Sequence, residues 1–114
     1  MAILVPLNVF KSQSANLSSN VSLLYSTPQD ITTIVLMAQV ANVSNAASNV
    51  TFFYKSGNTG PSTELVKGFV IYPNDAGTVL TGKLVLEQFQ SIFAQAGDND
   101  RLKITLSLLE TSNQ

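Results

Sequence analysis

Short segments in which apolar and polar residues alternate recur along this chain, and they restrict its fold more than any other feature. In residues 102–108, Leu or Ile at every even position alternates with Lys, Thr or Ser at every odd one. A period of two places successive side chains on opposite faces of a β-strand. Further strands are expected over 21–25, 31–43, 50–55, 64–72 and 78–87, each bounded by turn-forming residues. About seven or eight short strands at this spacing predict an all-β, antiparallel, jelly-roll-like β-sandwich.

The segment 31–43 is the longest expected strand, and both of its faces are largely apolar. Strict alternation places Ile34, Leu36, Ala38 and Val40 on one face and Val35 and Met37 on the other. A strand of this kind is expected at the centre of a sheet, covered by the second sheet on one side and by another subunit on the other. Val35 and Met37 are therefore candidate inter-subunit contacts.

The segment 88–96 fits two kinds of structure. Phe89, Ile92, Phe93 and Ala96 have the i, i+3, i+4, i+7 spacing of a helical stripe, whereas 91–95 also fits a short strand. Periodicity does not decide between them in so short a run. A strand is the preferred interpretation, and a short helix near 88–96 is the alternative.

The N-terminal residues 1–20 differ in composition from the expected sandwich domain, residues 21–114. Residues 11–20 are polar and contain one strongly apolar side chain, so they resemble a flexible tether. The first ten residues form either a strand at the sheet edge or an arm that docks on a neighbouring subunit. Its candidate contact residues are the apolar ones, Ile3, Leu4, Val5, Leu7, Val9 and Phe10.

The residue types present exclude many kinds of chemistry. The chain has no His, Cys or Trp, so it has no Cys/His metal site, cysteine nucleophile, Ser-His-Asp triad or disulfide. Its seven carboxylates fall in expected turns or at strand ends. The run Asp98-Asn99-Asp100 resembles half of a calcium loop, but Lys103 and Leu109 stand where that loop needs Gly and Glu. No enzymatic activity, metal or cofactor is expected.

The charge pattern indicates which partners to expect. The net charge is −1, and only 11% of residues are charged, which disfavours nucleic acid and anionic membranes as partners. The aromatic run 52–54 lacks the basic groove of a nucleic-acid stacking platform. The longest apolar runs are far shorter than the roughly 20 residues of a membrane helix. A polar, uncharged surface combined with a two-sided apolar strand instead favours self-association.

The sequences of several expected strands resemble those of a known group of proteins. They are Thr32–Asn42 followed by Val50–Phe52, then Thr63–Pro73, Thr81–Glu87 and Leu102–Glu110. Together they resemble small virion structural proteins of tailed bacteriophages, particularly those of marine cyanobacterial myoviruses, over about residues 21–111. Proteins of that group usually have Gly-Asp after the sequence that corresponds to Leu84-Val85-Leu86, whereas this chain has Gln88-Phe89-Gln90.

The resemblance implies a β-sandwich without enzymatic activity that is assembled into the virion in the host cytoplasm. The preferred role is a decoration or cement protein on the capsid, which contacts the major capsid protein. A neck, tail or baseplate component is the alternative. A carbohydrate-binding module is a weaker third hypothesis, because it would need a row of exposed aromatic residues. By analogy to small capsid-decorating proteins, a homo-oligomer is expected, with a trimer slightly favoured.

Overall fold

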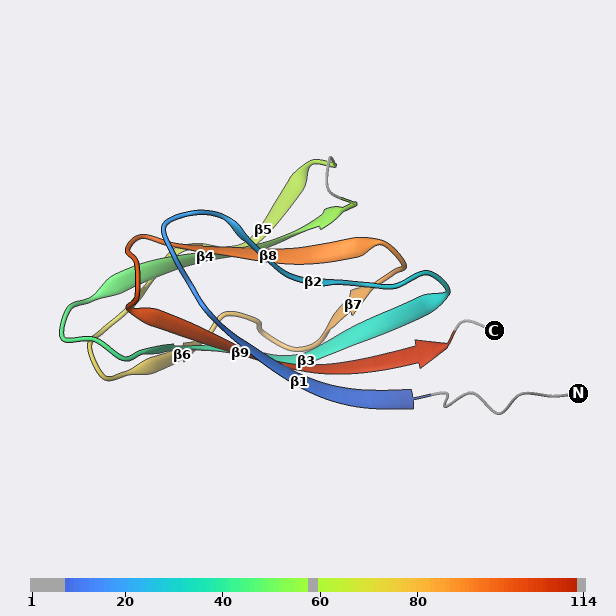
Figure 1. Ribbon diagram of the computed structural model, residues 1–114, viewed down its shortest axis with the longest axis horizontal. Coiled ribbons are helices and arrows are strands. Elements are labelled where there is room, and N and C mark those ends of the chain that lie inside the picture. The colour runs from blue at the N-terminus through green and yellow to red at the C-terminus, as the bar shows by residue number, and fades with distance from the viewer. Residues whose placement is uncertain (1–7, 58–59, 113–114) are drawn as a thin grey trace, which may run out of the picture.

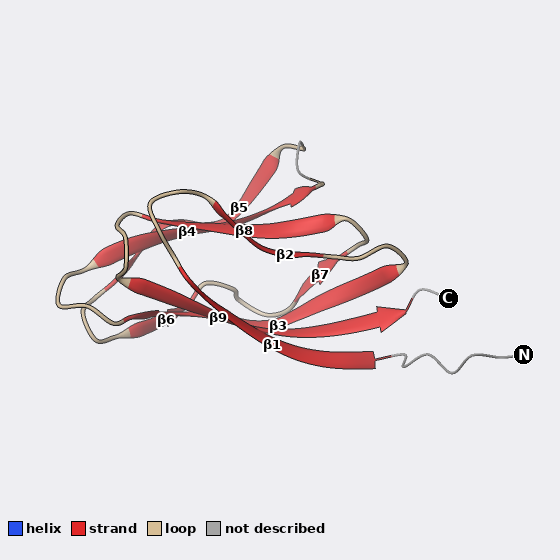
Figure 2. Cartoon of the chain, viewed as in Figure 1, coloured by secondary structure: helices blue, strands red, loops and turns tan. Residues whose placement is uncertain are grey.

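The computed structural model describes residues 8–57 and 60–112, which form two antiparallel β-sheets packed face to face (Figure 1). No helix occurs among these residues (Figure 2). The predicted all-β sandwich is therefore confirmed. The nine strands are β1 Asn8–Asn16, β2 Ser22–Ser26, β3 Ile31–Asn42, β4 Ser48–Ser56, β5 Ser62–Ile71, β6 Ala76–Thr78, β7 Leu84–Leu86, β8 Gln90–Ala96 and β9 Leu102–Ser112.

The strand order shows how the chain alternates between the two layers. The first sheet has the order β1-β9-β3-β6, and β7 also pairs with β3. The second sheet has the order β2-β8-β4-β5. The expected strand 78–87 is split into β6 and β7, because Val79 and Leu80 between them are buried in the core and Gly82 turns the chain at a φ of 81°.

The core lies between the inner faces of the two sheets. The predicted inward row of β9 is confirmed, since Leu102, Ile104, Leu106 and Leu108 are fully buried. Phe52 of β4 is the largest fully buried side chain of the facing layer. Burying side chains of this size contributes about 1.5–3 kcal/mol each.

Strand β3 contains a β-bulge that changes which of its residues face the core. Its pairing with β9 shifts register between Val35 and Met37, with Leu36 as the extra residue. A bulge lets two residues oppose one on the partner strand, so the alternation restarts after it. Val35 therefore faces the core together with Ala38, and its exposed fraction is 0%. The assignment of Val35 to a subunit contact is wrong for this reason.

The ambiguous segment near residue 90 is a strand. Strand β8 lies between β2 and β4, so the helical alternative for 88–96 is wrong and the preferred interpretation is confirmed. Phe89 belongs to the preceding turn, where its φ is +67° and its amide N–H donates to the Thr27 carbonyl at 2.9 Å. The apparent helical stripe therefore combined a turn residue with strand residues.

The N-terminal segment is described from Asn8 onward, where it forms edge strand β1. All nine residues of β1 pair with β9, from Asn8 opposite Thr111 to Asn16 opposite Lys103. The expected flexible tether is thus wrong over residues 11–16, because backbone pairing orders a polar sequence that has little apolar surface to bury. Ile3, Leu4, Val5 and Leu7, the remaining arm residues, lie outside the described residues.

Candidate interaction surface

Some acidic residues of the sandwich take part in structural contacts. Among the described residues, no group of three acidic side chains could hold a metal ion. In the loop between β8 and β9, Asp98 lies 3.2 Å from the Arg101 guanidinium and accepts a hydrogen bond from Ser48 at 3.0 Å. Asp100 in the same loop has a φ of 61°. Asp98 therefore ties this loop to the start of β4, and Asp100 adopts the left-handed φ that Asp tolerates in turns.

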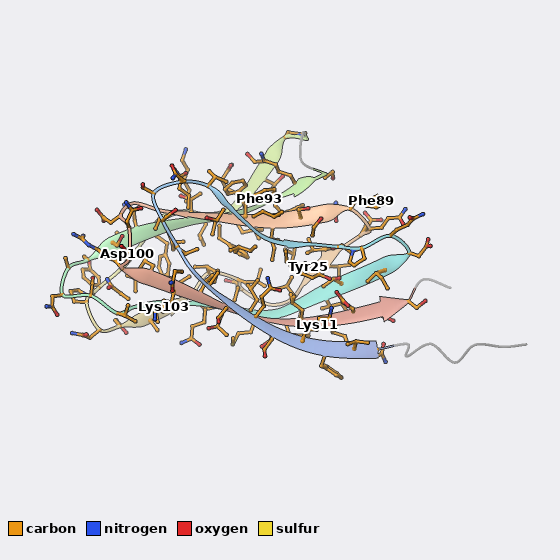
Figure 3. The ribbon with its side chains drawn as sticks, in the orientation of Figure 1. Lys11, Tyr25, Phe89, Phe93, Asp100 and Lys103 are labelled. Atoms are coloured by element: carbon orange, nitrogen blue, oxygen red, sulfur yellow. The ribbon has the colours of Figure 1, made fainter. Side chains whose placement is uncertain are left out.

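Glu110 of β9 has the most enclosed carboxylate, at the edge of the sandwich formed by β1 and β2. The Tyr25 hydroxyl of β2 donates to one carboxylate oxygen and also lies 2.8 Å from the Thr33 hydroxyl. The Lys11 ammonium of β1 lies 3.1 Å from the other oxygen. Figure 3 shows Lys11 and Tyr25 approaching this edge from different layers. The network therefore links the first sheet to the second.

The two central groups of this network have shifted pKa values. Burial raises the pKa of Glu110, but the hydrogen bonds from Tyr25 and Lys11 and the charge of Lys11 outweigh burial and lower it overall. Burial, together with the adjacent Glu110 carboxylate, raises the pKa of Tyr25 well above its usual range. Glu110 is therefore ionised and Tyr25 protonated at neutral pH. Such an arrangement stabilises the fold and does not hold a proton ready for transfer.

A continuous line of apolar side chains crosses the outer face of the first sheet. Phe10 of β1 lies opposite Leu109 of β9, Leu109 opposite Ile34 of β3, and Ile34 opposite Val85 of β7. We call these four residues the apolar row. Its two ends are the most exposed, with 73% of Phe10 and 57% of Val85 accessible to solvent. Residues paired directly across antiparallel strands lie on the same face, so the row spans four strands.

A shallow groove of about 340 Å³ adjoins the apolar row where β3 bulges. Its lining residues are Phe10, Lys11, Ser12, Leu36, Ser107 and Leu108. The bulge residue Leu36, which has no partner on β9, forms part of its wall. The register places Met37 on the outer face beside this groove, opposite Ser107.

The remainder of the outer face is polar and nearly uncharged. Away from the apolar row, its outward positions on β1, β9 and β3 are mainly Ser, Thr, Asn and Gln. Lys103 is the charged residue among these positions, and it lies at the far end of the face. The face therefore combines an apolar end with a mainly uncharged polar end that carries Lys103. Such a surface can bind another protein by apolar and backbone contacts.

The predicted contact residues fall in different places. Phe10 and Met37 both lie on the outer face, whereas Val9 is exposed on the opposite side of β1 and Val35 is in the core. The sequence reasoning missed Ile34 and Val85. It also missed Leu109, although an apolar residue at the odd position after Ser107 was a usable signal.

The outer face of the second sheet carries an aromatic pair that is already covered. The rings of Phe53 and Phe93 stack with centroids 5.4 Å apart, and the Lys55 ammonium lies 5.0 Å from the Phe93 centroid. Only 7% of Phe53 and 8% of Phe93 is exposed. The pair is packed into the sheet, so it does not offer open rings on which bases could stack.

Comparison with known proteins places the chain at the level of fold. No family model and no curated protein matches it. The described part of the chain contains no helix that could span a bilayer. The architecture of the described residues is that of a small jelly-roll-like sandwich.

Solved structures with this fold come from capsids and pili. A protein of Bacillus endospore appendages, which are disulfide-linked pili, matches with a TM-score of 0.57 at 11% identity. The match covers 94% of this chain and 88% of that chain. The capsid of Helicobacter pylori bacteriophage KHP30 matches with a TM-score of 0.58 at 10% identity, over 97% and 92%. A chain of the infectious bursal disease virus particle matches with a TM-score of 0.57 at 8% identity. The match covers 94% of this chain but only 31% of that chain. At these identities the likeness establishes the fold alone.

Proposed function

We propose that this protein is a non-enzymatic structural component of a bacteriophage virion that decorates the capsid. The observation that carries the proposal is the outer face of the first sheet, where an exposed apolar row and its groove lie in a nearly uncharged surface. The likeness to the KHP30 capsid supports it, because it covers nearly the whole of both chains. The partners are the major capsid protein and other copies of this chain, and assembly takes place in the host cytoplasm.

The proposed binding mode follows from the chemistry of this face. Phe10 and Val85 expose large apolar surfaces, which gain about 25 cal/mol for each Å² removed from water. Because the groove of about 340 Å³ is shallow, we expect modest affinity at a single site. A capsid lattice repeats the same site many times, so linked copies bind more tightly than single ones. Three of the six cations have partners within the molecule, because Lys11 contacts Glu110, Lys55 contacts the aromatic pair and Arg101 contacts Asp98. The other three, Lys67, Lys83 and Lys103, belong to β5, the loop before β7, and β9.

The alternatives are distinguishable. A neck, tail or baseplate position would use the same face on a different partner. A carbohydrate-binding module would use aligned aromatic rings, but the exposed rings lie on β1, on and just after β5, and in the turn before β8. They are Phe10, Phe69, Tyr72 and Phe89. They do not form a row within the described structure.

The direct test is rebinding to phage particles that lack the protein. The wild-type chain should bind capsids at saturable sites, and a Phe10→Ser, Val85→Ser double variant should bind at least about tenfold more weakly. A Val21→Ser, Leu23→Ser variant is the matched control, because it removes two similarly exposed apolar side chains from another surface. Electron microscopy of rebound particles locates the protein. Density confined to the neck, tail or baseplate would contradict the capsid role and support the alternative.

A further inference from the structure

The two sheets end in four edges, and three of them are protected against pairing with another strand. Natural proteins shorten, bend or charge such edges to avoid unwanted association. Strands β6 and β7 have three residues each. Strand β2 has five residues and a register shift. Strand β5 carries Glu64 and Lys67, shifts register twice against β4, and contains Gly68 at a φ of 66°. Its beginning turns away from the sheet (Figure 1).

The fourth edge, strand β1, has none of these protections. It is nine residues long, pairs with β9 without a register shift, and contains no Pro or Gly. Its single charged side chain, Lys11, reaches to Glu110 at 3.1 Å, and the side-chain amide of Gln13 donates to the Leu24 carbonyl. Both groups therefore bond within the same molecule. Along its outer side, β1 is exposed and has no second strand beside it in the described chain.

The direction of the backbone groups on β1 can be assigned. The Leu17 N–H donates to the Leu102 carbonyl of β9 at 2.9 Å. In a regular antiparallel pair, alternate residues direct both their N–H and C=O groups toward the partner, and the others direct them away. The odd-numbered residues of β1 therefore direct their backbone N–H and C=O groups toward β9. Phe10, Ser12 and Ser14 direct their backbone groups outward from the sheet.

We propose that two copies of this chain pair antiparallel through β1, about a twofold axis near Ser12. This register pairs Phe10 with Ser14 of the second copy and places Lys11 opposite the neutral Gln13, which avoids a direct lysine–lysine contact. The outward-directed residues of both strands meet one another, as hydrogen-bonded pairs require. The strand is thus complementary to itself, which identifies the occupant of this edge as a second copy. This inference does not depend on the proposed virion role.

The pairing has a geometric consequence for the apolar row. A twofold axis between antiparallel strands of one sheet is perpendicular to that sheet, so the outer faces of both copies point the same way. The first sheet of one copy and the first sheet of the other become one continuous sheet, which carries two apolar rows. A pair of this kind binds a repeated surface through two sites at once. It is also a different unit from the trimer favoured by analogy, and a mass measurement separates the two.

The test uses the full chain in solution and one backbone donor. Light scattering after size exclusion should give twice the 12.2 kDa monomer mass for the wild type at high micromolar concentration. Ser12→Pro removes an outward N–H that β9 does not use, and proline is tolerated at such edge positions. It should weaken dimerisation at least about tenfold. Ser12→Ala keeps the N–H and is the control, which should remain dimeric. A monomeric or trimeric wild type, or a dimeric Ser12→Pro protein, would overturn the proposal.

Hydrogen exchange tests the same contact without any substitution and covers the case in which Ser12→Pro does not fold. The amides of Phe10, Ser12 and Ser14 should exchange slowly at high protein concentration and much faster on dilution. The amides of Lys11 and Gln13, which face β9, should stay protected at both concentrations. Equally fast exchange of the outward amides at every concentration would refute the β1 pairing.

Discussion

At the scale of single residues, Glu110 connects the charge chemistry of the protein to its stability. Hydrogen bonds and an ion pair lower the pKa of this carboxylate despite its burial. A group whose pKa is lower in the folded state stabilises the fold at pH values above its unfolded pKa. That contribution is lost as the pH falls through the folded pKa.

Replacement of Glu110 by Gln should therefore destabilise the protein in a pH-dependent way. At pH 7 we expect the free energy of unfolding to fall by about 1–3 kcal/mol, because hydrogen bonds to a charged group are lost. The difference from wild type should shrink below about pH 4.3, the usual Glu value. Urea unfolding between pH 7 and 2 measures this. Glu64→Gln, at an exposed site, should change stability by less than about 0.5 kcal/mol. A pH-independent difference would contradict the assignment.

Neighbouring residues of β9 should respond in opposite ways to the same substitution. Ile104→Asp places a carboxylate in the core without a partner, at a cost of several kcal/mol or more, comparable to the whole stability of a small domain. We expect no soluble, cooperatively folded protein. Thr105→Asp, one position along on the outer face, should fold. Circular dichroism melting curves compare the two, and a cooperative melt for Ile104→Asp would disprove the burial assignment.

At the scale of elements, the bulge in β3 decides which side chains reach the core and which reach the surface. With Leu36 as the extra residue, Val35 and Ala38 both face inward although they are three positions apart. If the same residues formed a regular strand without the bulge, one half of the strand would present the wrong face to the core.

Deletion of Leu36 should leave a folded protein. The remaining sequence restores strict alternation from Val35 through Met37 to Ala38, so the inward set is unchanged. The groove loses part of its wall, and binding to particles should weaken. Deletion of Thr105 from the regular strand β9 is the control, because it reverses one half of that strand and should prevent folding. Thermal melting and particle binding measure both effects. An unfolded Leu36 deletion would show that the bulge is required for the fold.

The elements also show which features could be predicted from the sequence. Regular alternation identified β9 and its buried face correctly, since nothing interrupts it over residues 102–108. The bulge leaves no mark in the pattern, because Val35, Leu36 and Met37 are all apolar. The turn at Phe89 could not be predicted from the sequence, because bulky residues rarely adopt the positive φ that Phe89 has there. Of the candidate surface, Phe10 and Met37 were predicted. The apolar row as a whole depends on the register between strands far apart in sequence.

At the scale of the whole molecule, the first and last strands lie side by side, and their pairing defines the part of the chain that can fold alone. Every residue from Asn8 to Asn16 pairs with β9. Deletion of residues 1–7 should therefore change the melting temperature by less than about 3 °C. Deletion of residues 1–12 removes five of the nine residues of β1 together with Lys11, the ion-pair partner of Glu110. It should lower the melting temperature more than the shorter deletion does.

Particle binding by the two truncated proteins tests the docking-arm hypothesis separately. If residues 1–7 contact a neighbouring subunit, the shorter deletion should keep its melting curve but bind particles more weakly. Unchanged binding would argue against the arm. Loss of folding on deletion of residues 1–7 would show that the segment belongs to the sandwich itself.

The adjacency of β1 and β9 also determines how the protein can be labelled. Asn8 lies opposite Thr111, so the strands that lead to the two termini reach the same end of the domain. The loop between β8 and β9 lies at the opposite end (Figure 1). A fluorescent or gold tag attached at Asn8 or at Thr111 therefore reports nearly the same position. A second tag inserted at residues 97–101 marks the other pole, and the vector between the two tags gives the orientation of each domain on any surface that it covers.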